Sequence, residues 1–302
     1  MITVFNPQKT LNTPTSVALG TFDGLHVGHM AIINRLCSGG KYKKCVFTFS
    51  NSPASVAAKA DVKYVVSQQE KAALLKQSGV EYLLTTEFNK EFMALTAEEF
   101  FEKYILEILD AKEIFVGYNY TFGKFKTGTT LVLQELCDKH GISLNVMPPV
   151  FVEDAPVSST RIRKEIVGGN LELVKKLLGR NITIDGTVVE GNKLGRTMGF
   201  PTVNIAVDNG RALPPDGVYA AKTLIDGKAY GCIANLGGRP TVSDKGERLF
   251  EAHIVGFDGD LYGQYMTFEL AEKIRDICKF DSVDCLKNQL EKDIKMVNKI
   301  NL

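Results

Sequence analysis

The chain has 302 residues, which is enough for two ordinary domains with separate hydrophobic cores. Its 44% hydrophobic and 24% charged residues are typical of a globular protein, and the formal net charge of +1 favours neither nucleic acid nor an anionic membrane as a partner. The six cysteines include no C-x-x-C pair, so neither a metal cluster nor a disulfide scaffold is indicated. Because no secretory signal and no apolar run of membrane-spanning length is evident, we expect a cytoplasmic protein.

Strand-like and helix-like segments alternate over the first half of the chain. The expected strands are short apolar runs at 16–20, 44–49, 81–86, 113–117 and 142–148. The expected helices lie at 30–36, 68–79, 96–109 and 131–141, and Thr96 and Glu99 have the spacing of a capping box. This alternation predicts an α/β domain, a doubly wound parallel sheet with helices on both faces, whose ligands bind beyond the carboxyl ends of the strands.

The second half of the chain is rich in β-type residues. The expected strands lie at 182–190, 202–207, 217–225, 228–237, 249–257 and 264–270, and Asp226-Gly227 and Asp258-Gly259 predict tight hairpins. A closing helix begins near Ser282 and has Leu286, Leu290, Ile294 and Val297 along one face. The pattern predicts a small antiparallel barrel or sandwich with a C-terminal helix. Because a preceding helix ends at Gly179, we expect domains at 1–180 and 181–302.

His26 and His29 are three residues apart just after the strand that ends at Gly20, so in the first turn of a helix they share one face. Gly20 and Gly24 permit a sharp turn, and Gly28 leaves room for an anion to reach the backbone at a helix N-terminus. This arrangement suits a polyphosphate with imidazole hydrogen-bond donors. Taken alone, the pattern is equally compatible with two surface histidines beside a glycine-rich turn, and no nearby acid or cysteine completes a metal site.

A second group of anion-binding residue types lies at 157–163, where hydroxyls and arginines begin a helix. In isolation it reads equally well as a helix cap followed by a solvated basic turn. The stretch 26–29 is similar to the HxGH signature, and 157–163 to the ISSTxxR signature, of the nucleotidylyltransferase superfamily. Together the two favour a site that handles a nucleoside triphosphate, which other transferases of that superfamily also have.

The fuller set of motifs narrows the resemblance. With TFSNSP (48–53), EFN (87–89) and VGYNYTFGKFKTG (116–128), the chain resembles the prokaryotic bifunctional riboflavin kinase/FMN adenylyltransferase family. The resemblance implies a nucleotidylyltransferase-like first domain that joins FMN to the AMP of ATP and releases pyrophosphate. The residues it implies for ATP and phosphate are His26, His29, Gly20, Phe22, Gly24, Gly28, Asn119, Ser159, Thr160 and Arg163, and those for flavin include Asn119 and Phe122.

The stretch GNKLGRTMGFPTVN (191–204) suggests a loop that wraps phosphates with backbone amides, and it is not a P-loop. Thr202 and Asn204 offer neutral oxygen ligands of the kind Mg²⁺ accepts. Without further context, a flexible barrel loop explains it as well. It resembles the G-x-P-T-A-N motif of the kinase family, which implies that Gly195, Gly199 and Pro201 bind phosphate and that the second domain is a riboflavin-kinase-like barrel.

Later motifs follow in the family's order, at 234–241, 251–253 and 261–263. Phosphorylation of an alcohol needs a carboxylate to receive the hydroxyl proton, and the resemblance implies this role for Glu251. It also implies a flavin contact for Arg275, whereas His253 is as readily structural as functional. Glu251 taken alone would be read as a solvent-facing strand residue.

We therefore expect an enzyme of FAD biosynthesis that phosphorylates riboflavin with ATP and Mg²⁺ and then adenylylates FMN to FAD. Its expected partners are these small molecules, with no nucleic acid and no membrane, as a monomer or weak oligomer. Ser52 stands where the family usually has histidine, and Asn119 and Gly256 stand where it more often has aspartate. An enzyme with only one of the two activities is therefore an alternative. A flavin-binding sensor without turnover is a second alternative, which the retained transfer residues disfavour.

Overall fold

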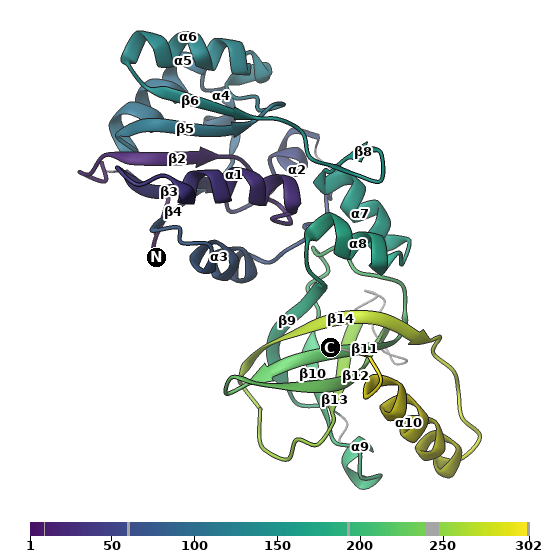
Figure 1. The fold of residues 1–302 in the computed structure, drawn as a ribbon. Helices are drawn as coiled ribbons and strands as arrows, with labels where there is room; N and C mark the ends of the chain where they lie inside the picture. The colour runs from purple at the N-terminus through teal and green to yellow at the C-terminus, as the bar shows by residue number, and fades with distance from the viewer. Residues whose placement is uncertain (9, 59–60, 192–193, 239–247, 301–302) are drawn as a thin grey trace. The chain divides into compact units, whose positions relative to one another are not determined.

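The computed structural model describes residues 1–302 except 9, 59–60, 192–193, 239–247 and 301–302. The chain divides into two compact units, Met1–Ser159 and Thr160–Leu302, whose elements are labelled in Figure 1. None of the helices in the described part of the chain has the length and apolarity that crossing a lipid bilayer requires.

A parallel sheet of six strands forms the first unit, in the order β1-β4-β3-β2-β5-β6. The strands are β1 (Ile2–Phe5), β2 (Thr15–Leu19), β3 (Lys43–Phe49), β4 (Tyr82–Thr86), β5 (Ala111–Gly117) and β6 (Ser143–Met147). The predicted doubly wound sheet is confirmed, with the additional edge strand β1. Because the strand order reverses between β2 and β5, the segments that follow these two strands meet at the topological switch point, where such sheets bind ligands.

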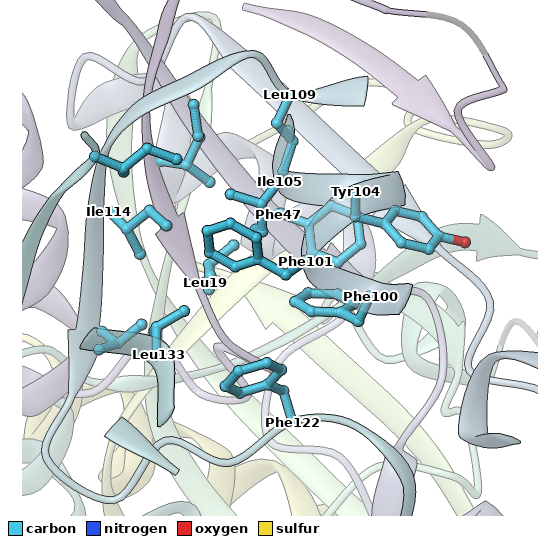
Figure 2. Close-up of a cluster of buried hydrophobic side chains, with 14 of the residues drawn as sticks. Leu19, Phe47, Phe100, Phe101, Tyr104, Ile105, Leu109, Ile114, Phe122 and Leu133 are labelled. Atoms are coloured by element: carbon cyan, nitrogen blue, oxygen red, sulfur yellow. The ribbon is translucent and has the colours of Figure 1, made fainter. Parts of the chain in front are cut away.

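Helices cover both faces of this sheet, because successive strand residues point to opposite sides. Ala18 of β2 packs on one face with residues from α1 (Val27–Ser38) and α3 (Gln68–Gln77). Leu19 packs on the other with residues from α5 (Ala97–Phe100), η1 (Phe101–Ile108) and α6 (Thr130–His140). Figure 2 shows this second cluster, in which aromatic rings of α5 and η1 stand beside Phe47 of β3.

The predicted helix at 96–109 begins as expected and then changes form. The Thr96–Glu99 capping box is present, but residues from Phe101 onward adopt a π-helix. Short elements complete the first unit: α2 (Pro53–Ala58), α4 (Lys90–Ala94), η2 (Lys124–Lys126), β7 (Phe151–Val152) and β8 (Ala155–Pro156). The second unit begins within α7 (Ser159–Val167) and continues with α8 (Leu171–Leu178).

The second unit contains a closed antiparallel barrel, in the order β10-β13-β12-β11-β14-β9. Its elements are β9 (Ile182–Val189), α9 (Leu194–Thr197), β10 (Thr202–Ala206), β11 (Gly217–Ile225), β12 (Lys228–Gly238), β13 (Arg248–Ile254), β14 (Tyr265–Arg275) and α10 (Val283–Val297). The predicted barrel and closing helix are confirmed. Phe250 and Phe268 are fully buried 5.1 Å apart, whereas Val297 of α10 packs on Val218 and Ile233.

One hairpin prediction is correct and the other is wrong. Asp226-Gly227 joins β11 to β12 as a two-residue turn, with Ile225 paired to Lys228. Asp258-Gly259 lies between β13 and β14, which are not neighbours in the barrel, so the turn cannot join a hairpin. Closing the barrel separates these two strands, and the connection becomes a longer loop.

Replacement of Phe101 by alanine tests the packing in Figure 2. The ring is fully buried, so its loss should lower the free energy of unfolding by about 3–5 kcal/mol. Urea titration followed by circular dichroism measures this change, because the chain lacks tryptophan. The matched control is Leu131→Ala on α6, which is 76% exposed and should change stability by less than about 0.5 kcal/mol. Equal effects of the two substitutions would contradict the core assignment.

Candidate active sites

The segment after β2 makes a tight turn that places the start of α1. Phe22, Gly24 and Leu25 all have positive φ, at 47°, 89° and 40°. The side chains of Phe22 and Leu25 are fully buried, and this burial compensates the backbone strain. A Cβ on Gly20 would lie 3.2 Å from the Phe22 ring, so glycine allows that ring to fold back under the turn.

His26 and His29 form one unit at the N-terminus of α1. Nδ1 of His26 accepts the backbone N–H of His29 at 3.1 Å, which caps the helix. The two rings are stacked, with centroids 3.6 Å apart and planes 15° from parallel. A Cβ on Gly28 would lie 3.2 Å from the His26 ring, so glycine at this position keeps the stack undisturbed. Because Nδ1 of His26 accepts this hydrogen bond, Nε2 is the ring nitrogen left to donate to a ligand.

Unlike Nδ1 of His26, Nδ1 of His29 accepts no backbone hydrogen bond among the described residues. This nitrogen is buried and has no hydrogen-bond partner within the part of the chain that the structure describes. Burial lowers the pKa of His29 well below 6.5, and the nearby His26 and Lys71 add to this effect. The ring is therefore neutral near pH 7, and its orphaned nitrogen offers a donor or acceptor to a bound ligand.

The other predicted site residues of the first unit differ in how far they are exposed to solvent. Ser159, the last residue of the first unit, donates from Oγ to the Asp23 carbonyl at 2.7 Å and so lies beside the turn after β2. Asn119 follows β5 at the switch point and is exposed. Phe122 is only 7% exposed and packs 5.5 Å from Phe100, so most of its ring belongs to the core.

Thr160 and Arg163 open the second unit on α7. Arg163 Nη1 donates to the Thr160 hydroxyl at 3.4 Å. The guanidinium and the hydroxyl are thus neighbours on one face of the helix, as their three-residue spacing requires. Their predicted role toward pyrophosphate stays a prediction.

A row of polar residues crosses three adjacent strands of the barrel. In register, Glu251 of β13 lies between Asn204 of β10 and Asn235 of β12. The amide oxygens Oδ1 of Asn204 and Asn235 are buried and have no hydrogen-bond partner among the described residues. Thr202 precedes Asn204 by two residues and shares its face of β10.

This row fits a magnesium ion. Hydroxyl, amide and carboxylate oxygens are the ligands that Mg²⁺ prefers. The buried, unpartnered Oδ1 of Asn204 supplies one such oxygen beside the Thr202 hydroxyl. We found no group of three or more histidine, cysteine or acidic residues placed to hold a metal in the described ranges, so an ion here would also need oxygens from water or substrate.

The loop before β10 is folded closely against this row. A Cβ on Gly191 would lie 2.2 Å from Nδ2 of Asn204, and a Cβ on Gly195 would lie 2.3 Å from the carbonyl oxygen of Phe200. Gly199 has φ 86°, and the Pro201 carbonyl lies 2.8 Å from Nδ1 of His253. His253 therefore supports the loop. Asn192 and Lys193 of this motif, and Arg239, Pro240 and Thr241 of a later one, lie outside the described residues.

A cavity of about 410 Å³ opens beside Thr202, a size typical of small-molecule sites. Arg196 lines it, together with Asp258, Asp260 and Tyr262 from the loop between β13 and β14. Of these, Arg196 lies in the motif at 191–204 and Tyr262 in the motif at 261–263, whereas Asp258 was predicted only as part of a hairpin and Asp260 was missed. Asn235 lies in the motif at 234–241 but was not named as a site residue, and Lys71 was missed altogether. A polar strand residue and a lysine within a helix carry no local signal of burial.

Arg275 lies in a structural network. Its Nε and Nη2 donate to Oδ2 of Asp293 at 3.0 and 2.9 Å, and its guanidinium stands 5.6 Å from the Phe280 ring centroid. Asp293 is completely buried on α10 and also accepts from Gln289 at 2.8 Å. Arg275 thus ties β14 to α10, and its predicted flavin contact stays a prediction.

The lowered pKa of His29 predicts a pH-dependent stability. Below pH 6.5 the unfolded chain binds a proton at this site that the folded chain does not, so stability falls as the pH falls. The loss should reach up to about 1.4 kcal/mol per pH unit. An NMR titration should show the His29 imidazole neutral at pH 6.5. Unfolding at pH 7.5 and 5.5 should show a smaller pH effect in His29→Gln, and an unchanged effect would contradict the assignment.

Comparisons with known proteins agree with both halves of the chain. The FAD synthetase family model matches residues 8–161, and the riboflavin kinase family model matches residues 178–301. The protein named bifunctional riboflavin kinase/FMN adenylyltransferase is 34% identical in Escherichia coli K12, over 92% of this chain and 90% of that protein. The protein of the same name in Bacillus subtilis is 32% identical, over 92% of this chain and 89% of its own length.

A solved structure named Macrolide-efflux Protein, from Streptococcus pneumoniae, is 35% identical with a TM-score of 0.88, and each chain is covered in full. The fold described above is thus shared over the whole length. With both family models matched in order, and relatives above 30% identity that extend over nine-tenths of the sequence, the chain belongs to the bifunctional riboflavin kinase/FMN adenylyltransferase family.

Proposed function

We propose that the chain makes FAD from riboflavin in two ATP-dependent steps, one in each half. The observation that carries the proposal is the presence of two chemically different sites in the halves that match the two family models. The first half has a stacked pair of imidazoles at a helix N-terminus. The second has a buried amide oxygen, which has no hydrogen-bond partner among the described residues, beside a carboxylate and next to a cavity.

For adenylyl transfer, the phosphate of FMN attacks the α-phosphorus of ATP, and the bond to the β-phosphate oxygen breaks to release pyrophosphate. No protein nucleophile is required, so the work of the enzyme is alignment and stabilisation of charge. We assign donation to the ATP phosphates to His26 and His29, with the α1 N-terminus adding its backbone dipole. Ser159, Thr160 and Arg163 would hold the departing pyrophosphate, and Asn119 and Phe122 the flavin nucleotide.

For phosphorylation, the terminal hydroxyl of the ribityl chain attacks the γ-phosphorus of ATP. Glu251 would accept the hydroxyl proton, because removal of this proton makes the attacking oxygen more nucleophilic. Thr202 and Asn204 would hold Mg²⁺, which neutralises phosphate charge when bound. Gly195, Gly199 and Pro201 would place the loop around the phosphates, and Arg275 would contact the flavin.

We infer that the enzyme acts in the cytoplasm on these small molecules, as a monomer or weak oligomer, with the functional boundary near residue 180. The family match supports that boundary, because the riboflavin kinase model begins at residue 178. The compact units divide earlier, after Ser159, because the helix at 171–178 packs on β9 and β14. The retained residues of both sites also argue against an enzyme with one activity and against a flavin sensor without turnover.

A product assay tests the proposal. Purified protein with riboflavin, ATP and Mg²⁺ should form FMN and then FAD, and both can be separated by chromatography. FMN without FAD, or FAD only from supplied FMN, would indicate an enzyme with a single activity. Flavin binding without any consumption of ATP would favour the sensor.

Paired substitutions should separate the two activities. His29→Ala should lower FAD formation from supplied FMN by about 10²–10³-fold, the range for loss of one preorganised donor, and leave FMN formation from riboflavin nearly unchanged. Glu251→Gln should have the opposite effect, because it removes the proton acceptor and keeps the shape. Each variant thus serves as the folding control for the other. Equal loss of both activities in either variant would contradict the site assignment.

A further inference from the structure

Lys71 is a buried cation that the mechanism above does not use. It lies on α3, which packs on the same face of the sheet as α1 (Figure 1). Only 4% of the residue is exposed. Among the described residues, its Nζ has one hydrogen-bond acceptor, the carbonyl of Thr21, at 3.1 Å. Burying an ammonium group with so few acceptors is costly, because three N–H groups lose their water. Two of those N–H groups therefore remain available to another acceptor.

The Thr21 carbonyl links Lys71 to the histidine pair. It also accepts the Thr48 hydroxyl at 2.9 Å, so two donors from different elements fix its direction. The same peptide group leads into Phe22, whose backbone is left-handed and whose ring stands edge-on to the His29 ring at 5.3 Å. A change in the Thr21 carbonyl would rotate this peptide and shift the ring that supports His29.

The positive charge of Lys71 also interacts electrostatically with His29. This charge lowers the pKa of His29, which places the two groups within electrostatic range of each other. Burial lowers the pKa of Lys71 itself to about 8, and the Asp23 carboxylate opposes that shift. The ammonium is therefore mostly protonated near pH 7, whereas the His29 imidazole is neutral. A bound polyphosphate carries several negative charges, and the buried ammonium of Lys71 would offset part of that charge.

We propose that Lys71 is a positioning residue for adenylyl transfer, which holds the turn at 20–24 through the Thr21 carbonyl and supplies it with a buried positive charge. This proposal rests on the proposed function of the first half. Lys71 acts through the turn that carries His26 and His29. Its remaining N–H groups need hydrogen-bond acceptors, which the oxygens of a bound polyphosphate would supply.

Two substitutions separate its contributions. Lys71→Met keeps the length and apolar stem and removes both the hydrogen bond and the charge, whereas Lys71→Gln retains an N–H donor without the charge. For Lys71→Met, kcat/KM for ATP in FAD formation should fall by about 10- to 100-fold, mainly through a higher KM for ATP, with the KM for FMN unchanged. Lys71→Gln should lie between it and the wild type. The matched control is Lys76→Met, an exposed lysine of the same helix, which should behave as wild type.

A second measurement does not depend on turnover. The pKa of His29, followed by NMR in the protein without substrates, should rise in Lys71→Met because a neighbouring positive charge has been removed. Unchanged KM for ATP together with an unchanged His29 pKa would overturn the proposal. A fall in kcat alone, with reduced thermal stability, would also overturn it in favour of a purely structural lysine. If the wild type makes no FAD from FMN, the proposed function fails, whereas the NMR result still decides the coupling between Lys71 and His29.

Discussion

The backbone N–H of His29 donates to Nδ1 of His26, and the geometry of the first site depends on this bond. It caps α1, fixes which nitrogen of His26 carries the proton, and sets the second ring on the first. The stack requires that residue 28 have no side chain, because a Cβ would press on the His26 ring. The left-handed turn before it is equally necessary, since it buries Phe22 and Leu25 and so anchors the helix start. One local hydrogen bond thus converts a glycine-rich turn into a rigid pair of donors.

In the barrel, close backbone packing fixes a polar side chain of the second site. There the backbone of Gly191 lies so close to the Asn204 amide that any side chain would displace it. The amide is held with its oxygen buried and unpartnered within the described chain, next to Glu251 on the neighbouring strand. The first site therefore offers N–H donors with an ammonium nearby, which would suit anions, whereas the second offers oxygens, which would suit a cation. In the function we propose, this contrast would let the two halves use ATP in different ways.

Sequence patterns predicted the features that depend on local periodicity. The apolar runs identified the central strands, and the reversal of strand order explains why Gly20 and Asn119, far apart in sequence, both follow strands at the switch point. The motif at 191–204 identified Thr202 and Asn204, and the structure pairs Asn204 with Glu251 of β13. Features that depend on distant contacts were missed. The edge strand β1 owes its strand form to pairing with β4, and Asp258-Gly259 fails as a hairpin because the barrel closes between other strands. Burial of Lys71 and the pairing of Arg275 with Asp293 are likewise visible only after folding.

The positions at which this chain departs from its family have local explanations in the backbone. Ser52 accepts the N–H of Ser55 through its hydroxyl, at 3.3 Å, at the start of α2, so it serves as a helix cap. Gly256 has φ 70° in the exposed turn after β13, a conformation that glycine adopts without the cost an aspartate would bear. Asn119 keeps a hydrogen-bonding group of the same size as aspartate without its charge, and its Oδ1 lies close to Gly117, 3.4 Å from where a Cβ would stand. Replacing a carboxylate by an amide there removes a negative charge from the edge of the sheet at which polyphosphate would bind. Each departure thus alters a turn or a charge at the margin of a site and leaves the stacked histidines, the amide of Asn204 and the carboxylate of Glu251 in place.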